Sequence, residues 1–372
     1  MSDLIDYVSW RGDLPIEKSP FNEVDALILS QLSYLDYSGI VAPCFLPQVT
    51  IADVLRQFKT SVDYKRRSHA GLFINPKTVD LLESCGKSVR FKNMAVCGFI
   101  NKIDLQREEQ FSVVTVLPGD KTAFIAFRGT DDTIVGWKED FNMSFTDVIP
   151  SQTDAVDYMA SLCGKNGIPS KLYKKIRIAG HSKGGNLAIY ATSFSTEKIK
   201  NKISDIYTFD APGLNEYLVK HSDFSRIKPF LHSFYPQFSI IGMLFNHPEN
   251  FTVVESGQDG IMQHDPFSWH VTGPRFVTLP DFENLGKYVQ KTLNAWFFGL
   301  SVEKREMFVE TMFKVLQATE ARTNTELSKN WFKNSAAVIK ALASLDSESR
   351  KETLHVIHLL FKTAAVEMPA LQ

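Results

Sequence analysis

The sequence predicts an α/β protein with a mainly parallel, doubly covered sheet. Segments rich in Val, Ile and Phe recur through the middle of the chain, and we expect them to be strands: 111–117, 123–127, 176–179, 205–209, 227–234 and 251–255. Helical patterns separate several of these strands, notably at 153–162 and 185–194. Such alternation is typical of parallel sheets. The turn residues at 118–121 predict a β-hairpin for the first two strands.

Helical patterns flank this central region on both sides. At the N-terminal side we expect helices at 21–37, 51–64 and 72–84. At the C-terminal side Ser301 is a candidate N-cap, and we expect helices at 301–317 and at 347–366, the second of which Pro369 closes. We therefore predict an N-terminal helical segment, a core and a C-terminal helical extension within one compact unit, at 1–95, 96–280 and 281–372. We expect the helices of the extension to pack on the sheet or on each other, and a cap over the active site or a dimer contact stays the alternative.

The composition is that of an ordinary globular chain, with 372 residues, 44% of them hydrophobic and 22% charged. The formal net charge of -1 argues against a nucleic-acid partner, which requires a basic face. No glycine-rich phosphate loop or cluster of metal ligands is evident, so we expect neither a cofactor nor a metal. The 4 cysteines form no CxxC pair, which indicates free thiols in a reducing compartment.

The chain also lacks the sequence marks of export or of membrane insertion. Its N-terminal residues are acidic and contain no apolar signal core. No uninterrupted apolar run approaches the length of a membrane span. We therefore expect a cytoplasmic protein with no transmembrane segment, while peripheral membrane contact and a homodimer stay open.

The stretch from Gly180 to Gly184, which reads Gly-His-Ser-Lys-Gly, carries the clearest chemical signal. A short apolar strand precedes it and a helical pattern follows it, as in a nucleophile elbow. In such an elbow a strained turn exposes the serine hydroxyl, and the two glycines allow the strand and helix to approach closely. We predict that Ser182 is the nucleophile and that the Lys183 backbone N–H is an oxyanion donor. The alternative is a tight turn in which the serine only caps the helix.

The side chain of Lys183 places a cation in the first turn of a helix, against the helix dipole. We expect a compensating ion pair, and the candidate partners are Asp131, Asp132, Glu139 and Asp140. Attraction of an anionic substrate is the alternative function of this cation.

The stretch Phe127-Arg128-Gly129-Thr130, with the polar turn and the Trp-Lys-Glu-Asp segment after it, resembles the class 3 lipases. In that family a Ser or Thr after Arg-Gly donates to the oxyanion, and Thr130 matches this position. The short helix that follows can act as a lid in the family. The resemblance therefore implies a lid that includes Asp132, Thr133 and Trp137, with Asp140 at the position of the lid-helix aspartate.

Further phrases extend the resemblance over nearly the whole chain. They lie at 7–13, 21–25, 181–187 and 263–267. Together they resemble a bacterial lipase-like family that is described mostly as a domain of unknown function. This resemblance implies an α/β-hydrolase fold and no particular substrate.

The base must follow Ser182, because the triad of α/β-hydrolases runs in the order serine, acid, histidine. His264 lies in a Gly- and Pro-flanked loop after the last predicted strand, so we predict it as the base. His270 is the second choice as the base. The residues around it alternate as in a short strand, so we expect its side chain to pack in the structure.

The position of the triad acid in this sequence differs from that in the class 3 lipases. In that family an Asp follows the strand that corresponds to 227–234, but no carboxylate occurs at 235–239. Asp210 directly follows the preceding strand, which is the arrangement of pancreatic-type lipases. We predict Asp210 as the acid, with Asp259 as the alternative and an Asx-turn as the purely structural explanation.

These assignments predict a serine esterase that cleaves small-molecule acyl or lipid esters through a Ser-His-Asp triad. A thioesterase or acyltransferase with the same triad is one alternative. An inactive protein that uses the α/β-hydrolase fold only for binding is another. The apolar run at 239–245 is expected to be core, with an acyl pocket as the alternative.

Overall fold

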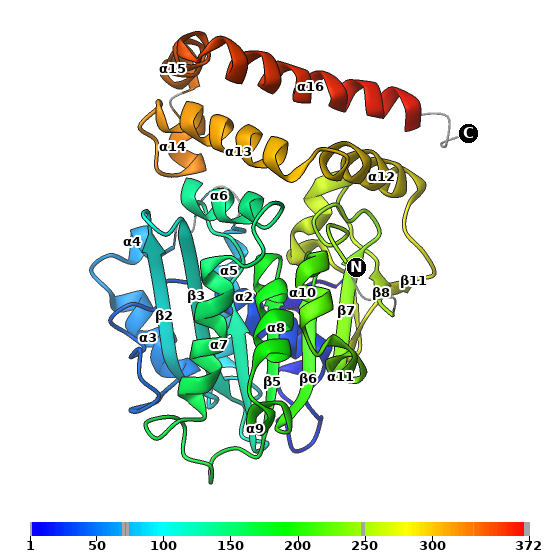
Figure 1. The fold of residues 1–372 in the computed structure, drawn as a ribbon. Helices are drawn as coiled ribbons and strands as arrows, with labels where there is room; N and C mark the ends of the chain where they lie inside the picture. The colour runs from blue at the N-terminus through cyan, green and yellow to red at the C-terminus, as the bar shows by residue number, and fades with distance from the viewer. Residues whose placement is uncertain (1, 69–70, 72–73, 247–249, 330, 368–372) are drawn as a thin grey trace.

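The computed structural model describes residues 2–68, 71, 74–246, 250–329 and 331–367. Within them the chain folds around a 9-stranded sheet with the order β1-β2-β3-β4-β5-β6-β7-β8-β11 (Figure 1). The strands are β1 (Val49–Thr50), β2 (Ala95–Asp104), β3 (Glu109–Leu117), β4 (Thr122–Phe127), β5 (Lys175–His181), β6 (Ile203–Phe209), β7 (Leu231–Pro236), β8 (Thr252–Val254) and β11 (Thr278–Leu279). A separate pair joins β9 (Val271–Thr272) to β10 (Arg275–Phe276).

The centre of the sheet is parallel from β4 to β8, whereas the strands toward both edges are antiparallel. The predicted hairpin is β3 with β4, in which Val113 lies opposite Phe127. The predicted strand at 227–234 begins only at Leu231, because short helical turns occupy the residues before it: α11 (Phe224–Ile227) and η1 (Lys228–Phe230). The long strand β2, which lies between β1 and β3, is absent from the sequence prediction.

Helices cover both faces of the sheet, as the sequence predicts (Figure 1). One face packs against α7 (Pro150–Leu162) and α8 (Lys183–Phe194), with α9 (Glu197–Lys200) and α10 (Glu216–His221) beside them. The other face packs against the N-terminal helices α1 (Leu4–Arg11), α2 (Glu23–Leu32), α3 (Ile51–Thr60), α4 (Tyr64–Arg67) and α5 (Lys77–Lys87). Alternate residues of β4 serve the two cores, because successive strand side chains point to opposite faces.

The N-terminal helices differ from their predicted ranges at their ends. α2 begins after Asn22, whose side chain accepts from the N–H groups of Val24 and Asp25 in a capping box. It ends at Leu32 rather than at residue 37, and the following turn brings Tyr34 toward the sheet. α5 begins after Pro76 because proline fixes φ at the start of a helix. Residues 72–73 of the predicted third helix lie outside the described residues.

The C-terminal helices lie over the carboxyl end of the parallel strands, above α6 (Ile134–Asn142) (Figure 1). They are α12 (Asn284–Phe298), α13 (Val302–Gln317), α14 (Asn324–Lys329), α15 (Trp331–Ser344) and α16 (Ser347–Glu367). Ser301 caps α13 as predicted, since its side chain accepts from the N–H of Lys304. A third apolar cluster joins Ile134 of α6 to Phe308 and Phe313 of α13.

The described C-terminal residues are helical as expected, and Pro369 lies outside them. The division at 95/96 and at 280/281 stays a prediction. In the described part of the chain no helix combines the length and the apolar character that a membrane span requires.

Candidate active site

Ser182 occupies a strained position between β5 and α8. Its φ of 57° and ψ of -134° fall outside the regions that L-residues favour. Such strain costs on the order of 1–3 kcal/mol and is maintained only where neighbouring structure holds it. The Ser182 N–H donates to the carbonyl of Phe209 at 2.9 Å, so the neighbouring strand β6 holds this turn. This is the strand–turn–helix geometry of a nucleophile elbow.

Two glycines make this turn possible. A Cβ on Gly180 would lie 2.1 Å from the carbonyl carbon of Gly184, and a Cβ on Gly184 would lie 2.1 Å from the Phe127 carbonyl oxygen. Both distances are far below van der Waals contact, and the obstructing atoms are backbone. The two glycines therefore allow α8 to begin directly against β4 and β5.

The structure brings the predicted base and acid together. His264 is the last residue of η2 (Gly260–His264), and its Nδ1 lies 2.5 Å from Oδ2 of Asp210. Asp210 directly follows β6, and its side chain is only 2% exposed. The other carboxylate oxygen accepts from the Ser239 hydroxyl and, at 3.2 Å, from the Gly242 N–H. Asp210 is thus an oriented acceptor for the imidazole.

His264 also contacts the residue that precedes Ser182. The rings of His181 and His264 lie with their centroids 4.5 Å apart and their planes tilted by 36°, and His181 Nε2 lies 2.9 Å from the His264 carbonyl oxygen. Within the described part of the chain no hydrogen bond joins the His264 ring to the Ser182 hydroxyl. Catalytic hydrogen bonds are often long or poorly aligned before substrate binds, so this geometry is compatible with a base.

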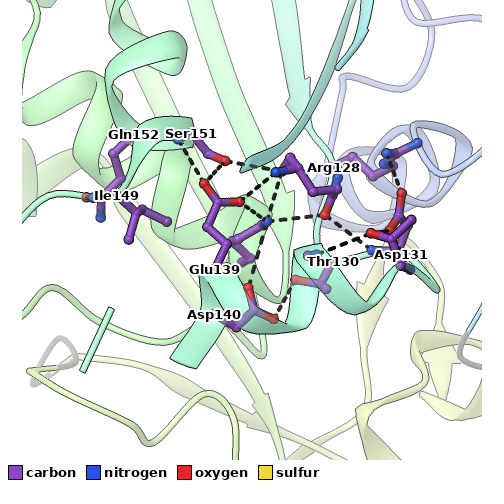
Figure 2. Close-up of polar contacts among 12 residues, drawn as sticks. Arg128, Thr130, Asp131, Glu139, Asp140, Ile149, Ser151 and Gln152 are labelled. Atoms are coloured by element: carbon purple, nitrogen blue, oxygen red, sulfur yellow. Dashed lines mark hydrogen bonds and ion pairs between the residues drawn. The ribbon is translucent and has the colours of Figure 1, made fainter. Parts of the chain in front are cut away.

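Thr130 follows the end of β4, as the resemblance implies, and its hydroxyl donates to Asp140 Oδ2 at 2.6 Å (Figure 2). Burial raises the pKa of Asp140 to about 6, although Lys183 and the Thr130 hydrogen bond lower it. The second oxygen, Oδ1, is buried without a hydrogen-bond partner and lies 3.8 Å from Lys183 Nζ. Asp140 therefore couples helix α6 to the turn that carries Thr130.

The Lys183 side chain is buried in an ion pair, as the sequence argument expects. Its Nζ lies 2.7 Å from Glu139 Oε2 and 2.9 Å from the Gln110 carbonyl oxygen. Glu139 also accepts from the backbone N–H of Ser151 at 3.0 Å, a contact that Figure 2 shows. Both charged side chains are at most 1% exposed. Of the four candidate partners, Glu139 and Asp140 face Lys183.

The remaining acidic residues of the turn have other partners. Asp131 pairs with Arg128 at 3.0 Å. The Asp132 carboxylate accepts from the N–H of Thr325 at 3.2 Å and so ties the turn to α14. Thr133 caps α6 by accepting from the N–H of Gly136, and Trp137 packs partly buried against the cluster under α13.

The alternative base and acid lie in different surroundings. His270 Nδ1 lies 3.1 Å from Glu255 Oε2, next to the short strand β9. Asp259 is exposed at the start of η2 and makes no side-chain cap hydrogen bond. Neither side chain has the contacts to the Ser182 elbow that the His264 segment makes.

The sequence argument missed three residues that support the site. Ser239 and Gly242 hold the Asp210 carboxylate, and both belong to the run at 239–245 that was expected to be core. Tyr34 lies 147 positions before His181, and its hydroxyl is 2.9 Å from His181 Nδ1. No local sequence signal marks these residues, since each acts through a long-range contact.

A cavity of about 430 Å³ lies under the C-terminal helices. It is lined by the segment after α6, the start of α10, Phe245, α12 and the start of α13. The apolar residues in this lining include Met143, Phe145, Phe245, Phe298 and Val302. A separate small pocket of about 10 Å³ shares Met143 and Phe245 with this cavity and is also lined by Asn186, which lies one helical turn after Ser182. Phe245 thus lines a cavity, whereas Met243 of the same run is buried core.

The described residues contain no group of three or more His, Cys, Asp or Glu side chains that is arranged to hold a metal. The parallel sheet, the covering helices and the elbow at Ser182 define a mixed α/β protein consistent with an α/β-hydrolase-like fold. Residues 85–314, more than half of the chain, match the family described as Mbeg1-like, and the chain belongs to that family.

No curated protein matches the chain. Among solved structures, the crystal structure of M37 lipase is similar, with 17% sequence identity over 59% of this chain and 68% of that chain. Its TM-score is 0.34.

Proposed function

We propose that this protein is a serine hydrolase that cleaves carboxylic esters, with acyl or lipid esters as substrates. The observation that carries the proposal is the strained Ser182 elbow beside a histidine that an Asp carboxylate orients. Backbone strain at a serine lowers the stability of the fold, and a chemical role of the serine hydroxyl accounts for such strain. The lipase-like resemblance of the sequence supports the same reaction class.

In the proposed mechanism Ser182 Oγ attacks the ester carbonyl carbon while His264 Nε2 takes the hydroxyl proton. Asp210 accepts from Nδ1–H of His264, holds that tautomer and stabilises the imidazolium. The bond to the alcohol then breaks, and the alcohol leaves with the proton from His264. Water, deprotonated by His264, attacks the acyl-enzyme, and the acid is released with Ser182 protonated again.

We propose that the oxyanion is held by the backbone N–H of Lys183 and by Thr130. Lys183 is the first residue of α8, so its N–H has no acceptor within the helix. Thr130 has a single hydroxyl proton, and Asp140 accepts it. We therefore propose that Thr130 donates to the oxyanion through its backbone N–H, while the hydrogen bond from its hydroxyl to Asp140 holds the residue in place.

We further propose that the cavity under α12 and α13 receives the acyl chain. Its volume lies within the roughly 300–1,000 Å³ of small-molecule sites. Its lining is mixed: apolar side chains such as Phe245 and Phe298 lie beside polar and charged ones such as Asn294 and Arg305. The loop that carries Phe245 also carries Gly242, which contacts Asp210, so one segment serves both the acid and the cavity.

The test is active-site labelling of the full-length protein with a fluorophosphonate probe. We expect the wild type to be labelled and both Ser182→Ala and His264→Ala to lose the label. Ser195→Ala removes another buried serine, whose hydroxyl contacts the Ala191 carbonyl and the Met159 sulfur, and His270→Ala removes the alternative histidine. Both of these controls should retain the label.

A panel of p-nitrophenyl esters of increasing chain length, beside the matching thioesters, then defines the substrate. Turnover of esters over thioesters is the expected result. Labelling that persists in Ser182→Ala would contradict the assignment of the nucleophile, and a wild type inert to the probe and to every ester would contradict the function.

A further inference from the structure

Tyr34 contacts the candidate active site from the N-terminal part of the chain. It follows α2, is 7% exposed and places its hydroxyl 2.9 Å from His181 Nδ1. Burial raises the pKa of Tyr34 well above its ordinary value, with Arg128 and a hydrogen bond from the Gly129 backbone partly offsetting the rise. The phenol therefore stays protonated and can donate to the imidazole.

The contacts of His181 determine which of its nitrogens carries the proton. Its Nε2 faces the His264 carbonyl oxygen at 2.9 Å, and a carbonyl oxygen can only accept. Nε2 therefore carries the hydrogen. Burial, together with the electrostatic effect of the neighbouring His264, lowers the pKa of His181 well below its ordinary value, so the ring is neutral. The remaining nitrogen, Nδ1, then accepts from the Tyr34 hydroxyl.

The resulting chain of hydrogen bonds connects three parts of the site. Tyr34 donates to His181, and His181 donates to the backbone of His264. A Cβ on Gly129 would lie 2.2 Å from the Tyr34 hydroxyl oxygen and 3.1 Å from Cβ of Ser182. The tyrosine hydroxyl therefore lies against the turn that carries Thr130 and close to the nucleophile.

The segment that carries His264 requires such support. η2 is a short turn on which Ile261 and Met262 are 59% and 61% exposed. Gln263 anchors it, since its side-chain oxygen accepts from the Phe238 N–H and its carbonyl from the Trp269 indole, both at 2.8 Å. Those bonds hold the turn to the core, whereas the bond from His181 joins it to the residue directly before Ser182.

We propose that Tyr34 and His181 are positioning residues that fix the His264 backbone relative to Ser182. This inference rests on the proposed function. It assigns a role in the site to the N-terminal helical segment, because Tyr34 lies outside residues 85–314 that match the family. Neither side chain exchanges a proton with the substrate, and both act through the placement of the base.

The test compares Tyr34→Phe with Tyr37→Phe in the full-length protein. Tyr37 is also buried near the end of α2, and its hydroxyl donates to the Leu32 carbonyl at 2.7 Å without touching His181. Each variant loses one buried hydroxyl and the hydrogen bonds that this hydroxyl makes, which for Tyr34 include the bond from the Gly129 backbone. With a p-nitrophenyl ester we expect Tyr34→Phe to lower kcat about tenfold at unchanged KM, because the loss affects the transition state and not ester binding. Tyr37→Phe should keep the wild-type kcat, measured per labelled active site.

A rescue series tests whether Tyr34 acts through His181. His181→Gln keeps an N–H near the position of Nε2, whereas His181→Leu does not, so the glutamine variant should retain the higher kcat. Adding Tyr34→Phe to His181→Leu should cause no further loss, because residues in one network are not additive.

Histidine NMR gives a readout that is independent of turnover. The side-chain nitrogen shifts of His181 should report a neutral ring with the proton on Nε2, and Tyr34→Phe should shift Nδ1. Equal kcat in Tyr34→Phe and Tyr37→Phe, or a proton on Nδ1, would overturn the positioning role while leaving the proposed function intact. A wild type without esterase activity or labelling would instead remove the proposed function and this inference together.

Discussion

His264 Nδ1 lies 2.5 Å from Asp210 Oδ2, although 54 positions separate the two residues in the sequence. The pair forms because β6 ends at Phe209 and because η2 returns over the carboxyl end of the sheet. The Ser239 hydroxyl and the Gly242 N–H bind the other carboxylate oxygen, so the acid has little freedom to rotate.

Asp210→Asn should lower kcat by about 10⁴-fold with little change in KM, because an asparagine cannot hold the imidazole in the required tautomer. Ester hydrolysis by the purified variant checks this. Asp259→Asn is the matched control, since Asp259 is an exposed loop aspartate close to His264 in sequence. If Asp259→Asn caused the larger loss, the acid would have to be reassigned.

Removal of one partner of the buried Lys183–Glu139 pair should be strongly destabilising. Either Lys183→Met or Glu139→Gln leaves an uncompensated buried charge, with an expected loss of about 3–5 kcal/mol in the free energy of unfolding. The double variant should lose less than the sum of the two single losses. Urea denaturation of all four proteins measures the coupling, and strictly additive losses would refute it.

Asp140 should make stability depend on pH. Its folded pKa is raised to about 6 from an ordinary 3.8, so its stabilising effect is present below about pH 4 and is lost as pH rises through about 6. The asparagine side chain of Asp140→Asn is neutral at every pH, so this variant does not lose stability in this way. Relative to wild type, the variant should gain about 2 kcal/mol between pH 4 and pH 7.

Urea denaturation at several pH values tests this expectation. His181 has a lowered pKa, so it destabilises the fold as pH falls below about 6.5, and it does so equally in both proteins. The difference between variant and wild type therefore isolates Asp140. A difference that does not change with pH would contradict the argument.

Narrowing the cavity should change the chain-length preference. Val302 begins α13 and lines the cavity, so Val302→Trp should reduce kcat/KM for long-chain esters more than for acetate esters. A change of about tenfold in the ratio corresponds to about two methylenes that can no longer be buried. Val89→Trp, at an exposed position directly after α5, is the control and should leave the ratio unchanged.

Some parts of the candidate site can be predicted from the sequence and others cannot. The elbow around Ser182 is readable because its glycines and its strand–turn–helix pattern are contiguous. The Lys183 ion pair was expected from the helix dipole, but four carboxylates were equivalent until the position of α6 singled out Glu139 and Asp140. The strand β2 was not predicted because its burial pattern is not uniform. Four consecutive residues near its start are buried, whereas exposure alternates along the rest of the strand.

The sequence by itself determined the local features: the alternation of strands and helices, the hairpin of β3 and β4, the cap at Ser301 and the turn at Ser182. Each follows from residues a few positions apart, whose backbone preferences and hydrogen bonds act locally. Only the tertiary structure decided that Asp210 faces His264, that Ser239 and Gly242 hold its carboxylate and that Tyr34 reaches His181. These contacts join separate strands and the N-terminal segment, and they arise because the packing of the whole sheet and its covering helices brings distant side chains together.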